Sequence, residues 1–285
     1  MILVIGATGQ IGSKITEGLI QSKADVRVFV RDENRLGDLK NENIQVAEGT
    51  FEDMESLEKA LEGVDRLMLI GQDNPDQVQQ HLNVIQAAKR QGVKHIVKLS
   101  AFGADKNSPV ALMRDHAEIE DAIKDSGMEW TFIRPHLYMQ NLLRFGDSVA
   151  ENNTFLAPMA HDAYSLVDIR DVAEVVATIL TTENHNSKIY TLTSPHAENY
   201  DEIAETLSSL LGKTITYQAQ SPKDFERDLL ESGTPEWRAY DLAYISKAYK
   251  GSDKHLITSD IEDLLGRPAR SVKDFLSDHL STFKN

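Results

Sequence analysis

The chain has 285 residues, 41% of them hydrophobic and 26% charged, which is enough to bury a sizeable core. Its formal net charge of −15 would repel nucleic-acid phosphates and anionic lipid, so we expect neither as a partner. The absence of cysteine excludes disulfides, thiol nucleophiles and thiolate metal sites.

Targeting and metal signals are weak throughout the chain. No apolar run approaches the roughly 20 residues that span a bilayer. A buried strand is already predicted at Ile2–Ile5, where a targeting segment would lie. The histidines show no paired metal spacing, so we predict no metal site, and a serine hydrolase elbow is also missing. We expect a cytoplasmic protein.

Short apolar runs alternate with amphipathic stretches as far as about Pro135. The predicted strands are Ile2–Ile5, Val26–Val30, Ile44–Ala47, Arg66–Ile70, His95–Leu99 and Trp130–Ile133. The predicted helices are Gln10–Gln21, Asn34–Lys40, Met54–Leu61, Gln77–Gln91 and Leu112–Asp125. Continuously apolar strands separated by helices predict an α/β fold, with a doubly wound parallel sheet of the Rossmann type.

The second half of the chain is predicted to be mostly helical. Helices are expected at Leu137–Val149, Asp168–Leu180, Tyr200–Leu211, Pro222–Ser232, Glu236–Tyr249, Ser259–Leu265 and Val272–Phe283, and strands at Ala163–Val167, Lys188–Leu192 and Thr214–Gln218. We expect a cofactor-binding domain over residues 1–150, which residues 163–193 rejoin, and a smaller substrate-side region over residues 194–285. Asp168 and Asp171 have the spacing of a helix cap.

A glycine-rich loop joins the first strand to the first helix. In Gly6-Ala7-Thr8-Gly9-Gln10-Ile11-Gly12, the first glycine permits a tight turn, and Gly9 lets the backbone approach a pyrophosphate. Gly12 allows the helix to pack closely on the strand, and the helix start attracts the anion. The order strand, loop, helix and strand predicts a dinucleotide site rather than a plain turn.

Arg31 ends the second strand. An NAD-selective site would place an acidic residue there to bind the ribose hydroxyls, whereas an arginine suits a 2′-phosphate. We therefore predict NADP(H) as the cofactor, with Arg35 as a second candidate contact. The alternative is an exposed arginine that is accompanied by Asp32.

Several segments together resemble the atypical short-chain dehydrogenase/reductase family in its NmrA-like branch. They are the glycine loop, Val30-Arg31-Asp32, Gly63-Val64-Asp65, residues 87–96, Ser100–Ala104, Arg134-Pro135, Tyr138–Leu142 and Val167–Ala173. Within this branch the chain is most similar to NADPH-dependent quinone reductases and triphenylmethane-dye reductases, over roughly residues 1–220.

The resemblance implies further cofactor contacts. Gly71 and Gln72 would pass near the ribose and pyrophosphate, and Ser100 and Ala101 near the nicotinamide ribose. The segment Pro135-His136-Leu137 and Asn141 would line the nicotinamide pocket.

The chain departs from the family at position 50, where an acidic residue is common and Thr50 stands instead. Asp53 remains either an adenine-side contact or a cap of the following helix.

The helix after the fifth strand departs from the usual catalytic pattern. Typical short-chain dehydrogenases carry a Tyr-x-x-x-Lys pair on the helix after the fifth strand, and this helix has no tyrosine. At the nearest matching spacing stand His116 and Glu120, which share a helix face, so His116 is our candidate proton donor, with Glu120 holding its ring. A positioning role or a surface pair remain alternatives. Tyr138 is our candidate for the wall of the acceptor pocket, or else packs on the core. Lys98 and Ser100 share one face of the fifth strand.

The absence of the tyrosine acid limits the class of acceptor that we expect. A ketone needs a proton at its developing alkoxide, whereas a quinone yields a phenolate of modest basicity and a cationic dye needs no acid. We therefore expect an NADPH-dependent oxidoreductase that transfers hydride to a small quinone-like or other delocalised acceptor. The alternative is a redox sensor that binds the dinucleotide without turnover and signals through a protein partner. A homodimer is compatible with either.

Overall fold

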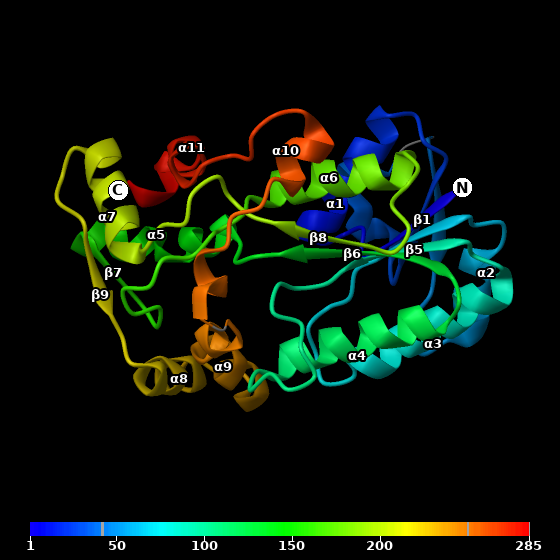
Figure 1. Ribbon diagram of the computed structural model, residues 1–285, viewed down its shortest axis with the longest axis horizontal. Coiled ribbons are helices and arrows are strands. Elements are labelled where there is room, and N and C mark those ends of the chain that lie inside the picture. The colour runs from blue at the N-terminus through cyan, green and yellow to red at the C-terminus, as the bar shows by residue number, and fades with distance from the viewer. Residues whose placement is uncertain (41–42, 250, 285) are drawn as a thin grey trace. The chain divides into compact units, whose positions relative to one another are not determined.

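A computed structural model describes residues 1–40, 43–249 and 251–284 (Figure 1). The chain divides into two compact units. The first comprises Met1–Lys106, Leu112–Arg134 and Arg170–Thr191, and the second comprises Asn107–Ala111, Pro135–Ile169 and Leu192–Asn285.

The first unit is built on a sheet with the strand order β3-β2-β1-β4-β5-β6-β8. These strands are β1 (Ile2–Ile5), β2 (Val26–Val30), β3 (Ile44–Glu48), β4 (Arg66–Leu69), β5 (His95–Leu99), β6 (Glu129–Pro135) and β8 (Lys188–Leu192). The pairs from β3 through to β6 are parallel, and β1 lies between β2 and β4 with Ile2 opposite Val26 and Arg66. The predicted doubly wound α/β sheet is confirmed, and β8 joins it as expected.

Helices cover both faces of this sheet. They are α1 (Gln10–Gln21), α2 (Met54–Leu61), α3 (Gln77–Gln91), α4 (Ala111–Asp125) and α6 (Ile169–Thr181), with the 3-10 helix η1 (Glu33–Leu39) after β2. In Figure 1, α2, α3 and α4 lie on one face of the sheet and α1 and α6 on the other. The predicted helix at Asn34–Lys40 is a 3-10 segment, because Gly37 adopts φ +53° and ψ −128° and breaks the helical path.

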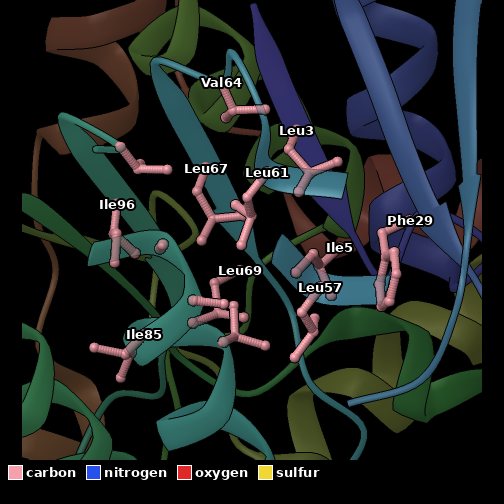
Figure 2. Packing of buried hydrophobic residues seen from close by; sticks show 14 of the residues in the cluster. Leu3, Ile5, Phe29, Leu57, Leu61, Val64, Leu67, Leu69, Ile85 and Ile96 are labelled. Carbon is pink, nitrogen blue, oxygen red and sulfur yellow. The ribbon is translucent and has the colours of Figure 1, made fainter. Parts of the chain in front are cut away.

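The core on the α2–α3–α4 side explains why these strands read as continuous apolar runs. Figure 2 shows Leu3, Ile5 and Leu69 of the strands facing Leu57 of α2 and Ile85 of α3. All but Ile85 are fully buried or nearly so. A strand that is covered on both faces needs an apolar side chain at every position, which removes the alternation of a half-exposed strand.

The second unit contains mainly short helices and a small sheet. Its elements are η2 (Met139–Phe145), α5 (Gly146–Asn152), β7 (Thr154–Ala157), α7 (Tyr200–Leu211), β9 (Thr216–Ala219), α8 (Pro222–Glu231), α9 (Glu236–Ala243), η3 (Ile245–Ala248), η4 (Gly251–His255), α10 (Asp260–Leu265), α11 (Val272–Asp278) and η5 (Leu280–Phe283). β7 pairs with β9 in parallel, and four rings pack around this pair, those of Phe145, Phe155, Tyr200 and Tyr217.

Three predicted helices are divided in the structure. The stretch Leu137–Val149 becomes η2 and α5, Glu236–Tyr249 becomes α9 and η3, and Val272–Phe283 becomes α11 and η5. At Gly146 a Cβ atom would lie 2.7 Å from the carbonyl oxygen of Thr282, so the glycine admits the C-terminal segment at the junction of η2 and α5. Residues 135–150 group with the second unit, so the observed division differs from the predicted boundary at 150.

The predicted strand at Ala163–Val167 is wrong. Tyr164 and Val167 each form one isolated bridge, to Glu198 and to Tyr138. The backbone N–H of Ser165 donates to a third segment, at the carbonyl of Lys254. The run is apolar because Tyr164, Leu166 and Val167 are fully buried, and burial alone does not make a strand.

No helix in the described ranges is long and apolar enough to cross a membrane.

Candidate functional site

A groove of about 740 Å³ lies in the first unit at the carboxyl ends of the strands. Its walls come from four strand ends and from α3: Ile5, Gly6, Thr8 and Gly9; Phe29, Val30, Arg31 and Arg35; Gly49, Thr50, Phe51 and Glu52; and Ile70, Gly71, Gln72, Asn74 and Gln80. Strand order reverses between β1 and β4, and α/β sheets bind their ligands at such a switch point. The groove brings together the predicted contacts Gly6, Thr8, Gly9, Arg31, Gly71 and Gln72.

The glycines of the loop meet different constraints. Gly6 has φ +85°, and a Cβ there would lie 2.8 Å from Cβ of Ile70. At Gly12 a Cβ would lie 2.0 Å from the carbonyl oxygen of Gly6, so the helix touches the loop backbone as predicted. At Gly9 the nearest atom would be 3.4 Å away, an ordinary contact. The fold therefore requires glycine at 6 and 12, and it leaves the space beside Gly9 open.

Helix α1 starts at this loop without a side-chain cap. Gly9 is its N-cap residue, and the first turn contains no acidic residue. The first helical hydrogen bond is donated by Ser13 N–H to the carbonyl of Gly9, at 2.9 Å. The N–H groups of Gln10, Ile11 and Gly12 precede it and have no helical acceptor. Free donors at the positive end of a helix dipole suit a phosphate group.

Arg31 provides the positive side chain at the end of β2. It is exposed and lines the groove together with Arg35. The carboxylate of Glu52 lies in the same groove, where a hydrogen bond from Thr50 and the charge of Arg31 lower the pKa of Glu52. This end of the groove therefore holds two guanidinium groups, which suit a phosphate, beside an ionised carboxylate, which suits an amine or hydroxyl donor.

A polar wall closes the groove on the α3 side. The amide nitrogen of Gln80 donates to Glu52 over 2.9 Å. Asn74 donates to Gln80 over 3.0 Å and to the carbonyl of Gln72 over 2.7 Å. No local motif in the sequence marks Glu52, Asn74 or Gln80 as groove residues. The position of Gln72 after β4 was the available signal.

Asp53 is a helix cap. Its carboxylate accepts hydrogen bonds from the N–H groups of Glu55 and Ser56, at 3.1 and 3.2 Å. Thr50, the residue that departs from the family pattern, lines the groove, whereas Asp53 does not. The structure thus shows the cap, and the adenine-side contact of Asp53 stays a prediction.

Ser100 and Ala101 follow β5. The hydroxyl of Ser100 is buried and donates to Glu120 of α4 at 2.6 Å. Arg134 donates to both carboxylate oxygens of Glu120, at 2.9 and 2.5 Å. Glu120 therefore holds Ser100 and Arg134 instead of the ring of His116, which corrects our interpretation of the pair. The contact of Ser100 and Ala101 with a nicotinamide ribose stays a prediction.

His116 lies one helical turn before Glu120 and is partly exposed. Its Nδ1 lies 3.1 Å from Nζ of Lys98, which is fully buried on β5. Burial and the charges of Lys98, His81 and Arg134 lower the pKa of His116 well below its usual value. Lys98 and Ser100 both reach α4, so the predicted shared face is confirmed.

The remaining predicted contacts, from Pro135 to Asn141, belong to the second unit. The N–H of His136 donates to the carbonyl of Leu192 at 3.0 Å, and the carbonyl of Leu137 accepts from Val167 at 2.8 Å. Burial raises the pKa of the Tyr138 hydroxyl above its ordinary range, so it stays neutral and can only donate or accept a hydrogen bond. The roles of Pro135, His136, Leu137, Tyr138 and Asn141 toward a nicotinamide or an acceptor stay predictions.

Two characterised relatives match the chain end to end. An NAD(P)H azoreductase of Xenophilus azovorans is 33% identical over 283 residues, which is 99% of this chain and 99% of the relative. Quinone oxidoreductase 2 of Escherichia coli is 31% identical over 291 residues, which is 100% of each chain.

Two solved structures have the same fold as this chain. The NADPH complex of an NADPH-dependent quinone oxidoreductase from Escherichia coli has a TM-score of 0.91 and 29% identity, and it covers 99% of this chain and 100% of its own. The NADP(H) complex of the triphenylmethane reductase from Citrobacter sp. has a TM-score of 0.87 and 29% identity, and it covers 98% and 99%.

A family model spans most of the chain. The NmrA-like model matches residues 1–272, which includes all strands of the main sheet and the whole groove. The chain therefore belongs to the NmrA-like family.

Proposed function

We propose that this protein is an NADPH-dependent oxidoreductase that transfers a hydride to a small quinone-like or other delocalised acceptor. The observation that carries the proposal is the groove, where an uncapped helix start and the Arg31 side chain lie at the switch point of the sheet. The named activities of the azoreductase and of the quinone oxidoreductase support the same class of reaction.

The residues present fit the cofactor. Gly9 leaves room for a pyrophosphate beside the free N–H groups of α1, and Arg31 would bind a 2′-phosphate. Gly71 and Gln72 would lie along the ribose and pyrophosphate. Bound NADPH would supply the hydride, and the chain would orient it and the acceptor.

The proton donors available on α4 indicate which class of acceptor the protein can reduce. No tyrosine stands on α4, and the neutral His116 is the candidate donor there. Such a site suits an acceptor whose reduced form is a phenolate, or a cationic dye whose reduced form needs no proton. Tyr138 is the candidate wall of the acceptor pocket.

The first test concerns Arg31. We expect Arg31→Ala to weaken NADPH binding by about tenfold or more, roughly 1.4 kcal/mol, because one charged partner of the 2′-phosphate is lost. NADH binding, which involves no such phosphate, should change by less than about twofold. Fluorescence titration of both nucleotides measures this, with Lys14→Ala as the control, since Lys14 is an exposed cation on α1 outside the groove.

Equal losses of NADPH and NADH affinity in Arg31→Ala would contradict the assignment of this residue. Turnover is tested with a panel of small quinones, azo compounds and triphenylmethane dyes. Tight NADPH binding without oxidation by any acceptor would contradict the enzyme and favour the sensor without turnover.

A further inference from the structure

The pair formed by Lys98 and His116 is the strongest unexplained feature of the first unit. Lys98 projects from a central strand and is fully buried. Its Nζ donates to the carbonyl oxygen of Leu99 at 2.8 Å and lies 3.1 Å from Nδ1 of His116. A lysine is rarely buried in this way without an acidic partner, because its ammonium group loses its hydration.

The groups around the pair are mostly basic. His116 and Glu120 face Lys98 from α4, and His81 approaches from α3. Arg134 of β6 faces His116 and takes up the charge of Glu120 through two hydrogen bonds. Among the described residues, Lys98 therefore has no carboxylate as a hydrogen-bond partner, and its Nζ contacts a carbonyl oxygen and an imidazole. Burial lowers the pKa of Lys98 to about 7, and the charge of Glu120 opposes this shift.

The geometry also defines which nitrogen of His116 carries the proton. The Lys98 ammonium has three hydrogen atoms to donate and no lone pair to accept with, and here it faces Nδ1. With Nδ1 as the acceptor, the proton of the neutral ring sits on Nε2. Among the described residues Nε2 has no hydrogen-bond partner, and the ring is partly exposed.

We propose that Lys98 and His116 form a proton relay that protonates the reduced acceptor, with His116 as the group that contacts the acceptor and Lys98 acting through it. This inference rests on the proposed function and adds the source of the proton. The pair stands at the carboxyl end of β5, on the edge of the sheet that carries the groove, because Lys98 reaches the carbonyl of the last residue of the strand.

The step balances for a quinone. Hydride addition gives the hydroquinone monoanion, and NADPH becomes NADP⁺. The Nε2–H bond of His116 then breaks as its proton passes to the phenolate oxygen, while a proton moves from the Lys98 ammonium to Nδ1. The ring ends neutral with its proton on Nδ1. When Nε2 later takes a proton from water, Nδ1 returns its own to the Lys98 amine.

The relay explains two observations together. His116 never needs to become an imidazolium, which its burial and its basic surroundings disfavour. A buried lysine can pass on its proton at neutral pH, and a phenolate with an ordinary pKa near 10 accepts it readily.

The kinetic test compares two acceptors in the full-length protein. Lys98→Met keeps an unbranched side chain without the ammonium, and His116→Gln keeps an N–H donor that cannot shift its proton. With a small quinone we expect each variant to lower kcat by at least about tenfold. With a cationic triphenylmethane dye, which takes up hydride and no proton, the change should stay below about twofold.

The pH profile and the double variant separate a relay from a structural role. Wild-type quinone turnover should fall above pH 7 as Lys98 loses its proton. This decline should be absent in Lys98→Met. Because the two residues act as one unit, Lys98→Met combined with His116→Gln should be no slower than either single variant. Losses that multiply, or equal losses with quinone and dye, would overturn the relay.

A spectroscopic test needs no turnover. Below pH 7, where Lys98 is charged, nitrogen-15 NMR of His116 in the cofactor-free protein should show the neutral ring protonated on Nε2, and Lys98→Met should mix the two tautomers. A proton on Nδ1 in the wild type at this pH would overturn the relay whether or not Lys98→Met folds. If the wild type oxidises NADPH with neither acceptor, the proposed function fails, whereas dye and quinone turnover that persist in both variants reject the relay alone.

Discussion

At the scale of single residues, the glycine loop separates positions that the fold requires from a position that only a ligand requires. Gly12 faces a backbone oxygen, which cannot move aside without disturbing β1 and the loop. Gly9 has φ −81° and ψ 165°, a conformation open to any residue, and an added Cβ would meet nothing closer than 3.4 Å. Neither backbone strain nor packing within the chain explains a glycine at position 9.

An alanine substitution should therefore affect stability at Gly12 and cofactor binding at Gly9. Gly12→Ala should lower the free energy of unfolding by about 1–3 kcal/mol through overpacking. Gly9→Ala should change it by less than about 0.5 kcal/mol and should weaken NADPH binding by about tenfold or more, because the methyl group occupies the space of the pyrophosphate. Urea unfolding and nucleotide titration measure the two quantities. Unchanged NADPH affinity in Gly9→Ala would remove the pyrophosphate from this loop.

At the scale of elements, the helices of the first unit begin and end where local chemistry dictates. The structure has α1, α2 and α3 at their predicted bounds. Asp53 caps α2 with its side chain, and Gly92 ends α3 with φ +74°. Such signals act within a few residues and can be read directly from the sequence.

The cap of α2 gives a prediction that separates stability from binding. Asp53→Ala should cost about 1 kcal/mol of stability, because two N–H groups lose their acceptor. NADPH affinity should change by less than about twofold. Asp53→Asn, which retains an acceptor, should restore most of the stability in thermal unfolding. A loss of NADPH affinity without a loss of stability would return Asp53 to the adenine side of the site.

Elements held together by distant partners could not be predicted in this way. β7 went unpredicted because its partner β9 lies about 60 residues further along, and both strands have only four residues. The buried run Ala163–Val167 looks apolar like a strand, yet its backbone bonds go to three separate segments. In both cases long-range pairing, which no local pattern carries, decides the structure.

At the scale of the whole molecule, buried histidines make the stability dependent on pH. Burial lowers the pKa of His81 to about 3 and the pKa values of His95 and His136 to about 4. As the pH falls from 6.5 toward these lowered pKa values, the three histidines therefore take up protons in the unfolded chain and stay neutral in the folded chain. Their contribution to stability is complete above pH 6.5 and is lost as the pH falls toward 4.

We expect the free energy of unfolding to fall below pH 6.5 by about 1.4 kcal/mol per pH unit for each such histidine. Urea unfolding between pH 7 and 5 measures the slope. His95→Gln retains a partner for the Thr131 hydroxyl, which lies 2.8 Å from His95 Nε2, and should reduce the slope by one histidine. The exposed His255→Gln serves as the control. An unchanged slope in His95→Gln would show that this histidine does not contribute.

The sequence by itself determined the parallel sheet, the glycine loop and the strand-end Arg31. These depend on apolar runs, glycines and single charges whose physical effects are local. It also pointed to His116 through its spacing along α4.

Only the tertiary structure decided which groups meet. It paired Glu120 with Ser100 and Arg134 and brought Lys98 to His116, although 18 residues separate Lys98 from His116 in the chain. It also joined Glu52, Gln80 and Asn74 into the wall of the groove. Side chains on different elements come together only when strand order and helix packing place those elements side by side, and that placement is a property of the folded chain as a whole.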